Sequence, residues 1–408
     1  MNFHNAFFIG IKYKKVVIYI SVLEINLNAI KNNLADVKKL LKYNQKLCVV
    51  AKANCYGLGA KKLCLELRKF CDYFAVSSAK EFFEIRRVTE KPIVILDPVF
   101  CGLKKLIKAG AELTISNFEG LKNLLDISEM CKEKIKVHIA INTGMNRFGF
   151  KTKSEVFEVV EKIKKSQKII ISGVFSHYFE ANNEIFADCQ FKKFLEMKQF
   201  ILERFNLNAI YHLANSDGLF SKNGFDMVRA GMVIYTDKKY PTITLKSKVL
   251  DMQNLNPFES AGYSSVYRKN CKCKVAIVGI GYGDGISRNI VKNGYVLING
   301  NYAKIVAICM DTLIVDVTNL NVKIYDEVVL IGKSKDKQIF ICDVAGWCDT
   351  IDYEIIVRLS NRIERKYIKW RKSLCKSSQE NIVQESFKQW TLKVQGQLLQ
   401  EWKSQFLI

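Results

Sequence analysis

The sequence predicts an α/β fold: a (β/α)8 TIM-like barrel followed by a smaller, mainly β C-terminal domain. Up to about residue 245, short apolar runs rich in β-branched residues alternate with helical patterns, and eight such runs occur. A βα unit that repeats eight times closes most readily into a barrel. A doubly wound open sheet is the alternative, but no GxGxxG segment follows the first run.

The eight strand-like runs have the length and the apolar content of buried parallel strands. They are Lys46–Lys52, Tyr73–Ser77, Pro92–Leu96, Glu112–Ser116, Ile135–Ile141, Lys168–Phe175, Ala209–Leu213 and Met227–Tyr235. The stretches between them show apolar residues at helical spacing. The clearest of these stretches are Ala60–Lys69, Ala79–Arg87, Glu119–Met130, Glu155–Lys164 and Asp188–Phe205.

The pattern changes after about Leu245, where short strands follow one another without helices between them. These runs are Lys274–Ile280, Tyr295–Ile298, Ala303–Cys309, Leu313–Val317 and Glu327–Leu330. They predict an all-β region with glycines and polar turns between its strands. We therefore divide the chain into an N-terminal extension (residues 1–15), a cofactor-binding barrel (16–245), a mainly β domain (246–369) and a tail (370–408).

The tail predicts an amphipathic helix in a Gln- and Lys-rich segment. Its apolar residues fall at helical spacing: Val383, Phe387, Trp390, Val394, Leu398 and Trp402. A helix packed on its own protein is the favoured interpretation, and a partner-binding helix or a disordered tail are the alternatives.

Composition favours a cytoplasmic protein that binds neither membrane nor nucleic acid. The apolar stretch Phe7–Ile20 is interrupted by lysines, so it predicts neither a signal peptide nor a membrane span. The net charge is +23, but the lysines are scattered along every predicted helix, which indicates solvated faces. The 13 cysteines show no zinc spacing, so we expect free thiols and no metal site.

Residues that carry chemistry follow the predicted strands, which is where active sites of such barrels lie. Lys52 closes an apolar run, and a desolvated lysine at a barrel mouth has a lowered pKa and a nucleophilic amine. The alternative is a lysine that extends from the rim into water. Ser216 and the amides at Gly231 and Met232 follow the last two strands, the usual phosphate position. A nucleophilic lysine beside a phosphate site fits pyridoxal 5'-phosphate.

The segment Val49–Gly57, VVAKANCYG, resembles the cofactor-lysine motif of the alanine racemase family. The resemblance continues in order through Thr143–Gly149, Ser176-His177, Asn215-Ser216, Arg229–Gly231, Gly262-Tyr263, Gly281–Gly285, Cys309–Asp311 and Tyr353-Glu354. It covers roughly residues 16–367. Each motif alone is weakly specific, whereas this many in order across both predicted domains are typical of the family.

The resemblance implies a racemase with two bases, Lys52 and Tyr263, on opposite faces of the cofactor. Lysine amines and phenols ordinarily have pKa values near about 10, so both need to be tuned downward. His177 and Arg229 are the expected tuning groups. Arg229 would face the ring nitrogen of the cofactor, and because arginine only donates, that nitrogen stays unprotonated. The ring is then a weaker electron sink, which disfavours transamination.

The resemblance also implies the remaining roles. The expected cofactor-binding residues are Lys52, Tyr56, His177, Asn215, Ser216, Arg229, Gly231, Met232 and Tyr353. Arg147 and Met310 would hold the substrate carboxylate, and Tyr282 and Arg288 would line the entrance. In the family, the equivalents of Tyr263 and Met310 reach the neighbouring subunit's site. A head-to-tail homodimer with shared active sites is therefore expected.

The sequence departs from the family pattern at several positions. Many members carry on the fifth strand a lysine that becomes carboxylated and orients the following arginine, but this chain has Ala140. Asn142 replaces an aspartate, Leu58 replaces a histidine and Ser264 stands where glycine is common. The GYGDG segment also lacks the usual preceding proline. These departures bear on turnover, carboxylate affinity and strict alanine specificity.

We therefore expect an enzyme, an alanine racemase that interconverts L-alanine and D-alanine and supplies D-alanine for peptidoglycan. A serine or broad-specificity racemase of the same fold is the first alternative. A barrel decarboxylase is disfavoured, because an acidic residue would then be expected where Arg229 stands. A non-catalytic cofactor- or nucleic-acid-binding protein is the alternative from another class.

Overall fold

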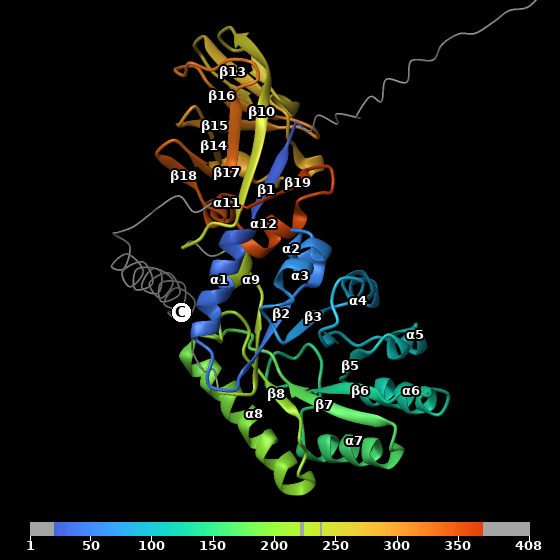
Figure 1. Cartoon of the computed structure of the whole chain (residues 1–408). Helices are drawn as coiled ribbons and strands as arrows, with labels where there is room; N and C mark the ends of the chain where they lie inside the picture. Colours follow the sequence, from blue (N-terminus) through green and yellow to red (C-terminus); the bar gives the residue numbers. More distant parts are fainter. Residues whose placement is uncertain (1–19, 221–223, 237–238, 370–408) are drawn as a thin grey trace, which may run out of the picture.

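The computed structural model describes residues 20–220, 224–236 and 239–369. Figure 1 shows two stacked units, a barrel with helices around it and a second unit built mainly of strands. The predicted amphipathic tail and the N-terminal extension lie outside the described residues.

The first unit is an eight-stranded parallel barrel, which confirms the predicted fold class. Its strand order is β8-β7-β6-β5-β4-β3-β2-β9. The strands are β2 (Lys46–Val50), β3 (Tyr73–Val76), β4 (Ile93–Ile95), β5 (Ala111–Ile115), β6 (Ile135–Ala140), β7 (Ile169–Phe175), β8 (Ile210–His212) and β9 (Met227–Ala230). The two ends of the sheet meet where the Arg229 amide donates to the Ala214 carbonyl at 3.0 Å. The sheet therefore closes on itself.

Helices cover the outside of this barrel (Figure 1). They are α1 (Leu27–Lys39), α3 (Ala60–Leu67), α4 (Ala79–Arg86), α5 (Leu103–Lys108), α6 (Phe118–Ser128), α7 (Lys153–Ser166) and α8 (Glu184–Phe205). Their starts follow from polar caps. At α7, for example, Thr152 and Glu155 form a reciprocal capping box. The apolar face of α7, with Val156, Val159 and Ile163 buried, packs on the barrel.

The prediction for the last barrel strand was wrong at its end. The expected strand Met227–Tyr235 stops at Ala230, and the short helix α9 (Met232–Tyr235) follows. Val233 and Ile234 suggested a strand because they are β-branched, but the Ile234 amide bonds to the Gly231 carbonyl at 2.9 Å. The first expected strand likewise ends at Val50, before Lys52.

The second unit contains a nine-stranded sheet of order β18-β17-β14-β15-β16-β13-β10-β1-β19. Its strands are β1 (Val22–Asn26), β10 (Ile243–Leu255), β13 (Cys273–Val278), β14 (Tyr295–Ile298), β15 (Asn301–Ile308), β16 (Leu313–Asp316), β17 (Glu327–Ser334), β18 (Lys337–Ile339) and β19 (Glu364–Ile368). A separate hairpin of β11 (Ser260–Ala261) and β12 (Tyr267–Arg268) packs against it. Three short helices were not expected between its strands: α10 (Ile290–Asn293), α11 (Ile341–Trp347) and α12 (Asp352–Arg358).

Strand β1 differs from the expectation that residues 16–245 form the barrel. It pairs antiparallel with β10 and parallel with β19, both in the second sheet. Its alternating pattern explains the placement, because Leu23 and Ile25 are fully buried while Glu24 forms an ion pair with Lys246 at 3.3 Å. The described chain therefore enters through the second unit before it builds the barrel.

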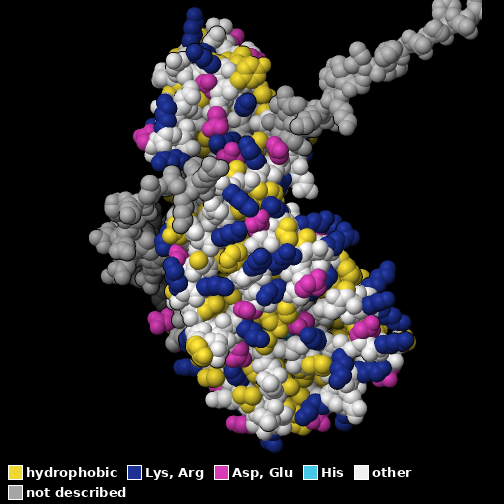
Figure 2. Space-filling view, in the orientation of Figure 1, with side chains coloured by type: hydrophobic (Ala, Val, Ile, Leu, Met, Phe, Trp, Pro, Cys, Tyr) yellow, Lys and Arg dark blue, Asp and Glu magenta, His cyan; other side chains and the backbone are white. Residues whose placement is uncertain are grey.

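Lysines and arginines are spread over both units on the face that Figure 2 shows, with acidic side chains between them. This agrees with the interpretation of the net charge as solvated faces. Among the described residues, no helix combines the length and apolar content needed to cross a membrane.

Candidate active site

Lys52 begins α2 (Lys52–Tyr56), a turn at the mouth of the barrel that is left-handed. Ala53, Asn54, Cys55 and Tyr56 have φ angles of 48°, 58°, 51° and 55°. L-residues with side chains rarely adopt this conformation in succession, because Cβ crowds the following carbonyl oxygen. Such backbone strain is found mainly where a site has to present a group in one orientation.

Polar contacts around the turn hold it in place. Glu81 accepts from the Ala53 amide at 2.7 Å and from the Ser77 amide at 2.9 Å. The side chain of Asn54 accepts from the Ala60 amide at 2.7 Å, which starts helix α3. These contacts fix the backbone that follows Lys52.

The second unit clamps the same turn from outside. The Tyr367 hydroxyl donates to the Leu58 carbonyl at 2.8 Å, and Arg365 Nε donates to the Gly57 carbonyl at 3.3 Å. A Cβ on Gly57 would lie 2.7 Å from the Ile356 carbonyl oxygen. Glycine is therefore required at this contact between α2 and α12.

The Lys52 amine is half-buried and makes no hydrogen bond or ion pair with any described residue. Burial lowers the pKa of Lys52 below its usual range, and the positive charges of Arg147 and Arg229 lower this pKa further. Asp97 and Glu81 oppose these effects by raising it. Both features, the partial burial and the lowered pKa, indicate that the Lys52 amine is reactive.

Arg229 is buried on β9, and both terminal nitrogens of its guanidinium donate hydrogen bonds. Its guanidinium donates to the carbonyls of Ser176, Leu213 and His212 at 2.7, 3.1 and 3.1 Å. It also donates to Nδ1 of His212 at 2.6 Å and to Nδ1 of His177 at 3.2 Å. Burial lowers the pKa of Arg229 to about 10. This value is still well above neutral pH, so the guanidinium stays protonated. Its Nε–H makes no hydrogen bond to a described residue.

His177 lies between these cations and is neutral. Burial, with Arg229, Arg147 and Lys52 nearby, lowers the pKa of His177 to about 3. His177 therefore does not lower the pKa of Lys52 through its own charge. Burial and the two arginines lower the pKa of Lys52 instead. Since Arg229 only donates, the unprotonated nitrogen of His177 is Nδ1.

A chain of hydrogen bonds runs from Arg229 into the barrel core. His212 Nε2 lies 2.9 Å from His138 Nδ1, and His138 Nε2 lies 2.7 Å from Glu112 Oε2. His138, His212 and Glu112 are all buried. The sequence analysis assigned these three residues to apolar strands and gave them no role. Their signal was a polar residue at inward positions of buried strands.

The expected phosphate-binding residues come together around the start of α9. Ser216 Oγ accepts from the Gly231 amide at 3.0 Å, and the Asn215 side chain accepts from the Gly218 amide at 2.8 Å. The rings of Tyr56 and Tyr353 lie 5.9 Å apart. Buried Met232 follows Gly231 as the first residue of α9.

The two tyrosines of this cluster are available as donors. Their hydroxyls make no hydrogen bond with any described residue, and burial raises the pKa of both Tyr56 and Tyr353. A Cβ on Gly231 would lie only 2.4 Å from the Tyr56 hydroxyl, so the cluster needs glycine there. Protonated hydroxyls around a helix start suit an anion such as a phosphate.

Arg147 is exposed on the loop that follows β6 and stacks on Phe148 at 4.7 Å. It forms no ion pair with a described residue. Asn142 shapes the loop, because its side-chain oxygen accepts from the amides of Gly144 and Asn146 at 3.0 and 3.1 Å. Thr143 anchors the loop to Ser176 at 2.8 Å.

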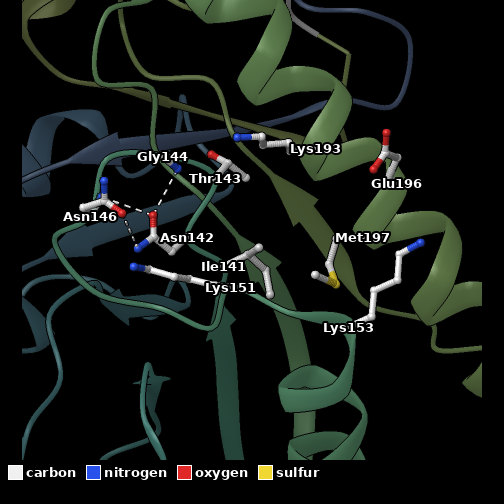
Figure 3. A pocket seen from close by; sticks show the side chains of 10 residues that line it. All are labelled: Ile141, Asn142, Thr143, Gly144, Asn146, Lys151, Lys153, Lys193, Glu196 and Met197. Carbon is white, nitrogen blue, oxygen red and sulfur yellow. Dashed lines mark hydrogen bonds between the residues drawn. The ribbon is translucent and has the colours of Figure 1, made fainter.

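A cavity of about 420 Å³ lies on the other side of this loop, against helix α8 (Figure 3). Lys151, Lys153 and Lys193 line it together with Glu196 and Met197. Lys52 and Arg229 do not line it. We therefore place the candidate active site at the barrel mouth and not in this cavity.

The remaining expected residues lie in the second unit and are exposed. Tyr263 starts the turn Tyr263–Ser265 and is 68% exposed, and Met310 is 53% exposed. Tyr282 and Arg288 are also exposed. The GYGDG segment has a structural role here, because the Gly283 amide bonds to the Met310 carbonyl at 2.8 Å. Neither Tyr263 nor Met310 contacts Lys52 in a described hydrogen bond.

Comparisons with known proteins agree on one family. Residues 25–239 match the model for the N-terminal domain of alanine racemase, and residues 242–367 match that for its C-terminal domain. The alanine racemase 1 of Clostridium acetobutylicum is 32% identical, covering 85% of this chain and 95% of that protein. The alanine racemase of Methanococcus maripaludis is 30% identical, covering 85% and 98%.

Solved structures show the same likeness. An alanine racemase of Clostridium difficile 630 superposes with a TM-score of 0.79 at 30% identity, covering 86% of this chain and 97% of that one. The Bacillus anthracis alanine racemase with bound L-Ala-P gives a TM-score of 0.79 at 26% identity, covering 86% and 96%.

Proposed function

Since the chain belongs to the alanine racemase family, we propose that it interconverts L-alanine and D-alanine with pyridoxal 5'-phosphate as its cofactor. One observation carries the proposal: Lys52, a half-buried amine with a lowered pKa, lies at the barrel mouth. The same barrel carries the cluster of Tyr56, Ser216, Gly231 and Tyr353, which suits a phosphate. The substrate is a small molecule that enters at this mouth.

The residues at the barrel mouth fit this cofactor. The hydroxyls of Tyr56, Tyr353 and Ser216 with the start of α9 suit its phosphate, and the unused Nε–H of Arg229 suits an unprotonated ring nitrogen. Met232, Asn215 and His177 complete the surroundings of these groups. When bound, the cofactor supplies an electron-accepting ring that acidifies the α-hydrogen of the substrate.

Lys52 would hold the cofactor through its amine and would take or return the α-proton of the substrate on one face. Its lowered pKa favours the unprotonated amine, which a base requires. The clamped turn around Lys52 fixes the direction from which the proton moves.

Tyr263 is the base for the other face, and the site takes it from a second subunit. The exposure of Tyr263 and Met310 in the isolated chain supports this, since large apolar groups at such positions suit an interface. Arg147 and the Met310 backbone would then hold the substrate carboxylate from two sides. Tyr282 and Arg288 would line the entrance of the completed site.

The test is incubation of the purified chain with L-alanine and pyridoxal phosphate, followed by chiral analysis of the amino acid. We expect equal amounts of L- and D-alanine at equilibrium. L-Serine and larger amino acids, assayed in parallel, distinguish an alanine enzyme from a broader racemase. Retention of L-alanine without change would contradict the proposal. We further propose that this activity is cytoplasmic and supplies D-alanine for peptidoglycan.

A further inference from the structure

The barrel interior contains one buried cation and one buried carboxylate among the described residues. Arg229 is 3% exposed and Glu112 is 2% exposed, and they lie on different strands without touching. His138 and His212 connect them through hydrogen bonds. A buried charge is costly unless polar groups compensate it. The hydrogen bonds to the two histidines therefore help to compensate both buried charges.

We propose that Glu112 is a positioning residue for Arg229, acting through His138 and His212 to keep the guanidinium in one orientation at the barrel mouth. The functional part of this inference rests on the proposed function, in which Arg229 meets the ring nitrogen of the cofactor. The hydrogen-bond chain itself does not depend on the cofactor.

The two ends of the chain fix its direction. A guanidinium only donates and a carboxylate only accepts. His212 Nδ1 therefore accepts from Arg229, His212 Nε2–H donates to His138 Nδ1, and His138 Nε2–H donates to Glu112. Both imidazoles thus have one tautomer. Burial, with Arg229 and His138 nearby, lowers the pKa of His212 well below its usual range, so this ring stays neutral.

The packing around the chain leaves the rings no second position. A Cβ on Gly173 would lie 2.2 Å from His138 Nδ1, so glycine makes the space that His138 fills. Phe175 stacks on His212 with ring centroids 5.1 Å apart and an interplanar angle of 12°. The guanidinium of Arg229 lies 5.6 Å from the centre of the same phenyl ring. Gly173 thus leaves space for His138, and Phe175 limits the movement of His212 and Arg229.

Loss of Glu112 would release the far end of this chain. The Nε2–H of His138 would have no acceptor, and both imidazoles could change tautomer in place, which would put a proton on His212 Nδ1 against the donors of Arg229. A displaced guanidinium would admit water to the ring nitrogen, whose protonation makes the ring a stronger electron sink. The α-proton would then return to the cofactor carbon more often, and alanine plus pyridoxal phosphate would end as pyruvate plus pyridoxamine phosphate.

The first experiment measures this error in the loaded enzyme. Pyruvate released per racemisation event is compared between the parent chain and Glu112→Leu. We expect the ratio to rise about tenfold, the effect of about one pKa unit in one interaction, with kcat lowered and KM for alanine nearly unchanged. Lys136→Ala is the matched control, because Lys136 lies 3.8 Å from Glu112 but is largely exposed. It should leave the ratio unchanged.

The second experiment observes the hydrogen bonds of His138 and His212 directly and does not depend on turnover. The sequence contains four histidines, so 15N labelling of histidine in the loaded enzyme gives few imidazole signals. We expect two exchange-protected Nε2–H tautomers in the parent, and in Glu112→Gln a joint shift of the His138 and His212 signals. An unmoved His212 signal, or a folded Glu112→Leu with the parent pyruvate ratio, would overturn the inference. If the parent makes no D-alanine, the proposed function fails, while the imidazole signals still show whether Glu112 fixes the two histidines.

Discussion

The two halves of the candidate site differ in how one chain prepares them. In the barrel, Arg229, Tyr56 and Ser216 are 3%, 6% and 7% exposed and contact residues from other parts of the chain. In the second unit, Tyr263 and Met310 are 68% and 53% exposed. The barrel half is preorganised within the chain, whereas the other half is exposed and, in the proposed function, is completed by a second subunit. This difference is what the following variants test.

The largest effect is expected from Lys52→Ala, which removes the reactive group of the buried half. The variant should lose the visible absorbance of the covalently held cofactor and nearly all conversion of L-alanine. The expected loss in kcat exceeds about 1,000-fold, because no neighbouring amine can replace a nucleophile. Absorbance spectra and chiral analysis measure the two effects. Normal colour and conversion would show that Lys52 is not the cofactor lysine.

Tyr263→Phe changes the exposed half and should leave the cofactor in place. We expect the parent absorbance together with a loss of about 100- to 10,000-fold in kcat, the usual contribution of a positioned acid or base. Exchange of the α-hydrogen with deuterated water, followed for each enantiomer, shows which face has lost its proton carrier. A variant that racemises at the parent rate would remove Tyr263 from the two-base scheme.

Mixing the two variants tests whether the halves come from different subunits. Lys52→Ala and Tyr263→Phe chains are unfolded together, refolded and assayed. If each site takes Lys52 from one subunit and Tyr263 from the other, random dimers recover about a quarter of the parent activity. If both groups come from the same subunit, every site is damaged and no activity returns. Mixing two batches of the same variant is the control.

Asp97→Asn is expected to have the smallest effect and sharpens the electrostatics of the buried half. Asp97 raises the pKa of Lys52 against burial and Arg147, so a neutral side chain should lower that pKa. The amine then becomes reactive at lower pH, and the midpoint of cofactor capture should move down by about one pH unit. Visible absorbance of the cofactor-free chain after cofactor addition measures this midpoint. Glu129→Gln, exposed at the end of α6, should not move it.

Most of the barrel could be predicted from the sequence because its strands are short β-branched runs with clear limits. The strands from β2 to β8 lie within two residues of the predicted ranges at each end. Strand β9 was extended into α9, since Val233 and Ile234 favour a strand locally while the Ser216 contact to Gly231 comes from another part of the chain. Strand β1 was placed wrongly because pairing with β19 joins residues over 300 positions apart.

The site shows the same limit. The grouping of Ser216, Gly231, Tyr56 and Tyr353 follows from motif order, and the structure brings them together. The neutral state of His177 could not be predicted, because it depends on burial and on three cations from distant parts of the sequence. His138 and His212 were missed because a polar residue inside an apolar run does not reveal its partner.

The left-handed turn that carries Lys52 has a consequence for how the protein is made. Its clamps, Arg365 and Tyr367, are separated from Gly57 and Leu58 by 308 and 309 positions. A ribosome that has just released all eight barrel strands has not yet translated these clamps. The strained backbone gains these two contacts only when β19 docks, near the completion of the polypeptide.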